Sequence, residues 1–136
     1  MPTADSKTPP DPHPIRVLLV DDHTMVREGL RNMLDAYPDV DVVAEARNGQ
    51  EALAAVEALR PSVVVMDITM PTMNGIDATA EITSRFPGTI VIGLSVQSGP
   101  AYEEAMREAG AAMLLTKEAA LDDLYRAIRE MVNAQV

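Results

Sequence analysis

The stretch SVVVMDITMPTMNG, residues 62–75, decides the fold of this chain. It opens with four apolar residues, a run typical of a strand that is covered on both faces of a parallel sheet. Asp67 follows this run directly, and Pro71 and the Asn74-Gly75 pair then turn the chain. An aspartate in such a place usually serves the turn. However, open α/β sheets also place their ligands at the carboxyl ends of their strands, so Asp67 is the first candidate site residue.

Three other apolar runs end in polar residues in the same way. They are residues 15–20, 89–94 and 111–116. The carboxyl ends of parallel strands meet at one edge of a sheet, so we expect these endings to form one polar rim. The rim would carry three carboxylates, one hydroxyl and one ammonium group, from Asp21, Asp22, Asp67, Ser95 and Lys117.

Composition and charge exclude several classes of protein. The 136 residues suit one domain with one core. No apolar stretch approaches the roughly 18 residues of a membrane span, and no secretory pattern opens the chain, so we expect a cytoplasmic protein without membrane contact. The absence of cysteine excludes disulfides and thiol chemistry. A net charge of −10 argues against direct nucleic-acid binding.

Hydrophobic periodicity divides the rest of the chain. Residues 1–14 are rich in proline and poor in apolar residues, which predicts a disordered tail or linker before a domain spanning 15–136. Five strands should alternate with five helices, and residues 39–46 should form a more polar strand at an edge. The helical residues expected to face the core are Val26, Leu30, Met33, Leu34, Ala52, Leu53, Val56, Leu59, Ala105, Met106, Ala109, Leu121, Leu124, Ile128 and Met131. The alternation predicts a doubly wound parallel sheet with helices on both faces.

The chemistry of the rim favours phosphoryl transfer. Three carboxylates in one place repel one another, and a hard divalent cation with oxygen ligands, Mg²⁺ or Mn²⁺, relieves this repulsion. Lys117 adds a positive charge for an anion and Ser95 adds a hydroxyl donor. These groups together can place a phosphoryl group on Asp67. Taken singly, Asp21 and Asp22 can also cap a helix, and His23 is more often a surface residue than a metal ligand.

Four segments together resemble the receiver (CheY-like) domain of response regulators in two-component signalling. They are LLVDDHTMVREGL (18–30), MDITMPTMNGIDAT (66–79), IVIGLSV (90–96) and AGAAMLLTKEA (109–119). The DDH start and the M-P-x-M-N-G loop are most similar to NarL/FixJ-type receivers. The resemblance covers roughly residues 15–133. It implies a flavodoxin-like (βα)5 fold with strand order 2-1-3-4-5.

The resemblance also assigns roles at the rim. It implies that Asp67 is the phosphoacceptor and one metal ligand, that Asp22 binds Mg²⁺ directly, and that Asp21 acts mainly through a metal-bound water. The backbone carbonyl of Thr69 would be a further protein ligand. Lys117 would contact the phosphoryl group. The phosphoryl donor would be a histidine kinase or a phosphotransfer protein, and the chain would catalyse only its own phosphorylation and dephosphorylation.

Ser95 matches the position of the family's switch residue, but three positions depart from the family pattern. Leu114 replaces an aromatic switch residue, so the change on activation should run through backbone and loop. Glu118 replaces a proline that is often cis, and we expect a trans peptide bond there. Val96 is larger than usual and should narrow the access to Asp67. Activation should alter a dimer or partner surface within residues 102–129, made of Tyr102, Met106, Met113, Tyr125 and Arg129.

Several other functions compete with that of a phosphoacceptor switch. A phosphatase that uses an aspartyl phosphate would tend to have a second carboxylate at position 69, where this chain has threonine. A flavin or nucleotide module would need a Gly/Ser/Thr-rich loop after the first strand, which DDHTM does not offer. A receiver module of a hybrid histidine kinase and a phosphorylation-independent interaction domain both remain open alternatives.

Overall fold

A computed structural model describes residues 13–68, 74–96 and 99–134 of the chain. Within these residues, strands and helices alternate as the periodicity predicts. The strands are β2 (Ile15–Val20), β3 (Val40–Ala46), β4 (Val63–Asp67), β5 (Ile90–Ser95) and β6 (Met113–Thr116). The helices are α1 (Thr24–Asp35), α2 (Gly49–Leu59), α3 (Gly75–Arg85), α4 (Pro100–Glu108) and α5 (Lys117–Ala134).

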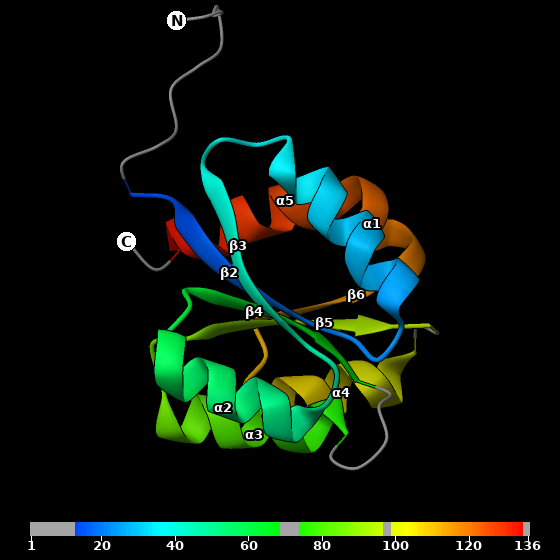
Figure 1. Cartoon of the computed structure of the whole chain (residues 1–136). Helices are drawn as coiled ribbons and strands as arrows, with labels where there is room; N and C mark the ends of the chain where they lie inside the picture. Colours follow the sequence, from blue (N-terminus) through cyan, green and yellow to red (C-terminus); the bar gives the residue numbers. More distant parts are fainter. Residues whose placement is uncertain (1–12, 69–73, 97–98, 135–136) are drawn as a thin grey trace, which may run out of the picture.

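The strands form one parallel sheet in the order β3-β2-β4-β5-β6 (Figure 1). In chain order this is 2-1-3-4-5, which confirms the expected flavodoxin-like topology. The more polar strand β3 lies at one edge, as predicted, and β6 lies at the other. The two central strands that carry aspartates, β2 and β4, are direct neighbours. The topology therefore brings their carboxyl ends together.

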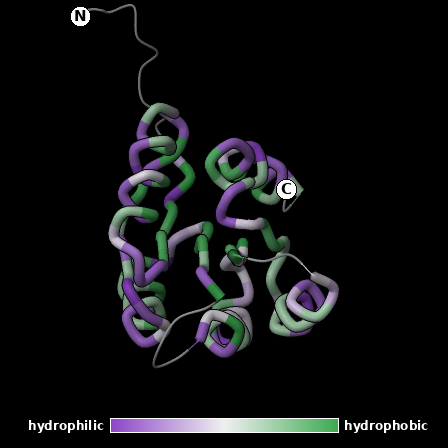
Figure 2. Tube along the Cα trace, turned by 90° about the vertical axis from the view of Figure 1, so that its right-hand side faces the viewer, coloured by the Kyte–Doolittle hydropathy of each residue, from purple (hydrophilic) through white to green (hydrophobic). Residues whose placement is uncertain are grey.

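Helices cover both faces of the sheet, with α1 and α5 on one side and α2, α3 and α4 on the other (Figure 1). Successive residues of a strand point to opposite faces. Accordingly Val17 and Leu19 of β2 pack with α1 and α5, whereas Leu18 and Val20 pack with the helices of the other side. Figure 2 shows the hydrophobic residues concentrated on the strands between the two helical layers. No described helix is both long and apolar enough to span a bilayer.

The start of α3 is fixed tightly against the end of β4. The Asn74 side chain caps the helix by accepting a hydrogen bond from the backbone nitrogen of Asp77 at 2.9 Å. Gly75 then passes so close to β4 that an added Cβ would lie 2.1 Å from the carbonyl oxygen of Asp67 and 2.5 Å from the Cα of Ile68. Only glycine allows this approach, so the turn after Asp67 depends on the residue at position 75.

Some local predictions were wrong. The last strand begins at Met113 and not at Ala111. Leu59 and Leu121, expected in the core, are 37% and 55% exposed. Conversely Arg27, a polar residue of α1, is buried. The peptide bond between Lys117 and Glu118 is trans as predicted, because the described residues contain no cis peptide bond.

Candidate functional site

The polar rim predicted from the sequence forms at the carboxyl ends of the strands. Asp21 follows β2, Asp67 is the last residue of β4, and Lys117 follows β6 directly as the first residue of α5. The hydroxyl oxygen of Thr116 accepts a hydrogen bond from the backbone nitrogen of Ala119 at 3.0 Å, which fixes the first turn of α5. This turn directs the Lys117 side chain over the ends of the central strands.

Lys117 joins two buried carboxylates. Its Nζ lies 3.0 Å from Oδ2 of Asp21 and 3.1 Å from Oδ2 of Asp67. The side chains of these residues are 13%, 2% and 0% exposed, respectively. Removing charges from water is unfavourable unless they are paired. The ammonium group therefore compensates the two aspartates in the described state.

The pKa of Lys117 reflects the same balance. Burial disfavours the charged amine and lowers its pKa, but the hydrogen bond with Asp21 and the negative charges of Asp67 and Asp21 act in the opposite direction. The net result is a pKa above its ordinary value of 10.5. Lys117 is therefore positively charged at neutral pH.

His23 belongs to the cluster, although its place in the sequence favours a surface role over that of a metal ligand. Its Nδ1 lies 3.0 Å from Oδ1 of Asp21 and 3.1 Å from Oδ1 of Asp22. Its backbone nitrogen also donates to Oδ1 of Asp21 at 2.8 Å. The sequence signal was only the position of a histidine directly after two aspartates, and such a histidine is more often a surface residue.

A buried arginine holds the segment that carries the first two aspartates. Nη1 of Arg27 donates to the backbone carbonyl of Asp21 at 2.5 Å, and Nε of Arg27 lies 2.9 Å from Oε1 of Glu45 on β3. Glu45 also pairs with Arg31, whose Nη1 is 2.5 Å from Oε2. The hydrogen bond from Arg31, opposed by burial and helped by Arg27, lowers the pKa of Glu45. This network links α1, β3 and the rim.

The donor atoms of the rim fit a divalent cation. Asp21, Asp22, His23 and Asp67 can each offer one ligand atom such that all of these atoms lie within 4.8 Å of one another. Asp21 and Asp67 are buried, while Asp22 and His23 are exposed and open to solvent. Three carboxylate oxygens match the preference of Mg²⁺ and Mn²⁺. The carbonyl of Thr69, named as a further ligand from the sequence, lies outside the described residues.

Comparison with known proteins identifies the family. The model of the response regulator receiver domain matches residues 17–129. The chain belongs to this family. It is a receiver domain of the response regulators of two-component signalling, and receiver domains of this family act with histidine kinases or phosphotransfer proteins.

Its relatives are regulators of the NarL/LuxR type. The receiver is 36% identical over 115 residues to the transcriptional regulatory protein DegU of Brevibacillus brevis, covering 85% of this chain and 49% of that protein. It is 39% identical over 121 residues to the response regulator GacA of Pseudomonas protegens, covering 89% and 57%. The chain therefore spans about half the length of these curated relatives.

Solved structures give the same assignment. The receiver domain of the NarL regulator from Mycobacterium tuberculosis superimposes with a TM-score of 0.85 at 32% identity, covering 90% of this chain and 98% of that one. The receiver domain of CheB from Thermotoga maritima gives a TM-score of 0.82 at 34% identity, covering 88% and 97%. Because DegU is a longer regulator named for transcription, the absence of direct nucleic-acid contact stays a prediction.

Ser95 of this receiver domain lies where the sequence placed it. It is the buried last residue of β5, next to Leu94, which is paired in register with Asp67. Ser95 itself is paired with Thr116, the residue before Lys117. The following residue, Val96, is 66% exposed and turned toward solvent. Ser95 thus ends the strand that lies between β4, which ends in Asp67, and the edge strand β6.

The expected output surface is wrong in part. Met106 is buried in the core. The ring of Tyr125 stacks on that of Tyr37, with centroids 3.6 Å apart, and both Tyr125 and Arg129 bind Asp39 before β3. Tyr125 and Arg129 therefore contact residues on the α1 side of the sheet. A dimer through residues 102–129 stays a prediction, but these five residues do not form one exposed face.

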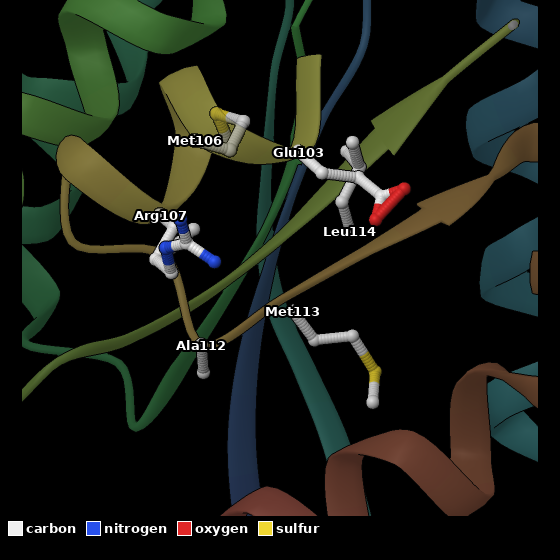
Figure 3. A pocket seen from close by; sticks show the side chains of 7 residues that line it. Glu103, Met106, Arg107, Ala112, Met113 and Leu114 are labelled. Atoms are coloured by element: carbon white, nitrogen blue, oxygen red, sulfur yellow. The ribbon is translucent and has the colours of Figure 1, made fainter. Parts of the chain in front are cut away.

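A hollow of about 190 Å³ lies instead between α4 and the edge strand β6 (Figure 3). Glu103, Met106 and Arg107 of α4 line it from one side, and Met113 and Leu114 of β6 from the other. Gly93 keeps this region compact, since a Cβ there would lie 2.6 Å from Cε of Met106 and 2.8 Å from Cδ1 of Leu114. Leu114, which stands in place of an aromatic residue, thus packs beside Met106 over β5.

Proposed function

We propose that this receiver domain is a phosphoacceptor switch that takes a phosphoryl group onto Asp67 from a histidine kinase or phosphotransfer protein. The observation that carries the proposal is the position of Asp67. This fully buried carboxylate ends a central strand, 3.1 Å from the ammonium group of Lys117 and within 4.8 Å of the donor atoms of Asp21 and Asp22. A buried acid with a cation on one side and acidic neighbours on the other is poised for phosphoryl chemistry.

The transfer breaks the phosphorus–nitrogen bond of a phosphohistidine and forms a phosphorus–oxygen bond to a carboxylate oxygen of Asp67. The electron pair of the broken bond stays with the imidazole of the donor, which takes up a proton. Lys117 pairs with the negative charge that arrives on Asp67, and Ser95 donates its hydroxyl hydrogen to a phosphoryl oxygen. Hydrolysis of the acyl phosphate by water restores the carboxylate, so the chain acts on itself and not on a separate substrate.

Asp21, Asp22 and Asp67 are the residues proposed to hold Mg²⁺ or Mn²⁺. When bound, the cation would neutralise part of the negative charge that the carboxylates and the phosphoryl oxygens bring together. The two buried aspartates supply fixed oxygen atoms, since Lys117 and the Arg27 network hold them in place. Asp22, which is more exposed, supplies a ligand on the solvent side.

Labelling with acetyl phosphate in the presence of Mg²⁺ tests the proposal. The parent chain should gain the mass of one phosphoryl group that hydroxylamine removes, and Asp67→Asn should gain none. Asp77→Asn is the matched control, because Asp77 is an exposed aspartate of α3 at some distance along the chain from the acceptor. Labelling that persists in Asp67→Asn, or that is lost equally in Asp77→Asn, would contradict the assignment of Asp67.

The phosphoryl donor is proposed to dock on α1 beside the rim. A mainly apolar hollow of about 290 Å³ is lined by Met25, Gly29, Lys117 and Leu121, among others. Met25 is 84% exposed, and Lys117 lines both this hollow and the acidic cluster. An apolar surface next to the acceptor is suited to a partner that delivers its phosphoryl group there.

A negative charge placed in this hollow should affect phosphorylation by a histidine kinase but not phosphorylation by acetyl phosphate. Met25→Glu should slow phosphotransfer from a histidine kinase that labels the parent chain, while labelling by acetyl phosphate should be unchanged. Leu59→Glu, at an exposed leucine of α2 on the opposite face, should leave both reactions unchanged. Equal transfer from the kinase to Met25→Glu and to the parent would place the docking surface elsewhere.

A further inference from the structure

The imidazole of His23 is part of the rim, and neither the proposed function nor the role of the three aspartates explains it. Nδ1 is the ring nitrogen that lies 3.0 Å from Asp21 and 3.1 Å from Asp22. It is also 3.4 Å from Nζ of Lys117. The ring is thus directed into the cluster of charges and not along the surface of α1.

Two features fix His23 in this position while leaving it accessible. The backbone hydrogen bond to Asp21, at 2.8 Å, holds the residue at the end of the β2 strand just before α1. At the same time the side chain is 60% exposed, so an ion from solvent can reach it. A held yet accessible imidazole beside carboxylates is a common composition of transition-metal sites in proteins.

The donor set of the rim is therefore mixed. The carboxylate oxygens suit Mg²⁺ and Mn²⁺, whereas an imidazole nitrogen suits Co²⁺, Ni²⁺ and Zn²⁺. Mg²⁺ gains little from a nitrogen ligand and retains water in its place. An imidazole among the carboxylates should therefore change the affinity for the second group of ions and leave that for Mg²⁺ nearly unchanged.

We propose that His23 is a ligand of the divalent cation at the rim and shifts its preference toward Co²⁺, Ni²⁺ and Zn²⁺. This inference rests on the cation site of the proposed function and deepens it, because it names the ions that the site takes beyond Mg²⁺. Nδ1 of His23 supplies the nitrogen, and Asp21 and Asp22 supply oxygens beside it.

Isothermal titration of the full chain with Mg²⁺ and with Co²⁺ tests the inference. His23→Phe keeps a ring of similar shape without nitrogen. We expect it to weaken Co²⁺ binding about tenfold or more, since even groups that only support metal ligands contribute about 10- to 100-fold. Mg²⁺ affinity should change by less than about threefold, as expected for an ion that prefers oxygen ligands. His13→Phe, which alters the other histidine of the chain, should change neither affinity.

Nitrogen NMR provides a second measurement, which distinguishes direct metal ligation by His23 from a role in positioning the aspartates. Zn²⁺ should shift the Nδ1 resonance of His23 strongly and leave the resonances of His13 unchanged. An equal loss of Mg²⁺ and Co²⁺ affinity in His23→Phe would mean that the ring only holds the aspartates, and would overturn the inference. Unchanged Co²⁺ affinity in a variant with the thermal stability of the parent would overturn it as well.

The failure of the inference and that of the proposed function are distinguishable. If the parent binds Mg²⁺ and Asp22→Ala does not, the cation site stands whatever His23→Phe shows. If the parent binds Co²⁺ through His23 but neither binds Mg²⁺ nor accepts a phosphoryl group with it, the inference stands and the proposed function fails. A parent chain that binds neither ion would overturn both.

Discussion

The centre of the sheet and its β6 edge contribute opposite parts of the rim, and they differ in how firmly they are packed. All five residues of β4 are buried, whereas all four residues of β6 are only half-buried. Asp67 at the end of β4 has no exposed surface, and Gly75 packs against its backbone. At the β6 edge, a hollow separates part of α4 from the strand.

This difference indicates which parts of the domain should keep their structure and which should move. The proposed acceptor belongs to the central strands, whose neighbours are backbone atoms and packed aliphatic groups. The less completely buried edge contains Lys117 and the adjacent β6–α4 region, which would respond to phosphorylation of the acceptor. Interiors at full packing density transmit a displacement, and edges with free space absorb it. Lys117 connects the two regions.

Lys117→Met should have the largest effect, because it breaks this connection. The variant leaves two buried aspartates without their compensating charge, a loss that typically costs about 3–5 kcal/mol of folding free energy. Mg²⁺ should stabilise the variant more than the parent, since the ion replaces the missing positive charge and no longer competes with the ammonium group. Urea unfolding with and without Mg²⁺ measures both effects.

Lys117→Met should also lose most of the phosphorylation response while it retains cation binding. Arg107→Met, at an exposed cation of α4, is the control and should behave as the parent. An identical Mg²⁺ effect on the stability of Lys117→Met and of the parent would mean that the lysine and the ion do not share Asp21 and Asp67.

Two glycine substitutions compare the packing at the end of β4 with the packing against α4 and the edge strand β6. Gly75→Ala places a Cβ against the backbone of Asp67 and Ile68 and should destabilise the domain by about 3 kcal/mol, at the upper end of overpacking effects. Gly93→Ala meets the ends of two flexible side chains, Met106 and Leu114, and should cost only about 1 kcal/mol. Thermal and urea unfolding of both variants tests the difference.

Gly29→Ala provides the reference for both. Among the described residues, an added Cβ at this position of α1 meets no atom within 4 Å beyond its chain neighbours and the backbone of its own helix, so alanine should stabilise the helix by about 0.5–1 kcal/mol. If Gly93→Ala proves as destabilising as Gly75→Ala, the edge is as rigid as the centre and the comparison fails.

Arg27→Met should destabilise the domain near β3, the edge of the sheet opposite to β6. The variant removes the hydrogen bond to the carbonyl of Asp21 and one partner of Glu45, and hydrogen bonds to charged groups contribute about 1.5–3 kcal/mol. Arg31→Met, which leaves Arg27 in place, should cost less, because the side chain of Arg31 is 43% exposed and that of Arg27 only 9%. We also expect weaker Mg²⁺ binding in Arg27→Met only, measurable by calorimetry.

A pH-dependent effect concerns Asp39, which lies just before β3, at the edge of the sheet opposite to β6. Burial raises the pKa of Asp39, but the hydrogen bonds from Tyr125 and Arg129 together lower it by more than burial raises it. The net pKa therefore lies below its ordinary value of 3.8. The unfolded chain therefore takes up a proton more readily than the folded one. The contribution of these contacts is complete above pH 3.8 and is lost as the pH falls through the folded-state value.

Tyr125→Phe should consequently be less stable than the parent by about 1 kcal/mol at pH 6, and the difference should shrink when urea unfolding is repeated near pH 3. Tyr102→Phe, at an exposed tyrosine of α4, should match the parent at both values. A difference for Tyr125→Phe that is independent of pH would mean that lost packing, and not the bond to Asp39, causes the destabilisation.

The sequence predicted best what depends on neighbouring residues. Apolar runs ending in Asp21, Asp67, Ser95 and Lys117 indicated the strands and their common rim, because strand length and burial leave a local pattern. The strand order came from the family resemblance, since periodicity alone does not order strands in a sheet. The boundary between the proline-rich segment and the domain remains a prediction.

The features that the sequence left open or predicted wrongly involve contacts between distant residues. Arg27 is buried because Glu45 and the carbonyl of Asp21 surround its guanidinium group, and no helical pattern contains these partners. Tyr125 and Arg129 are predicted from the sequence on a dimer or partner surface, yet Asp39 binds both of them. Leu121 fitted the apolar stripe of α5 but borders the open hollow beside α1. Each of these outcomes depends on the arrangement of whole elements.

The stack of Tyr37 on Tyr125 has a practical consequence for optical spectroscopy. The chain has three tyrosines and no tryptophan, so its near-ultraviolet signal comes mostly from tyrosine. Two of the three rings lie parallel within 6° at a centroid separation of 3.6 Å, a geometry in which their transitions couple and give a circular dichroism band. The third, Tyr102, is exposed on α4. The dichroism of the pair therefore reports the contact of the segment after α1 with α5, on the side of the sheet opposite to α4.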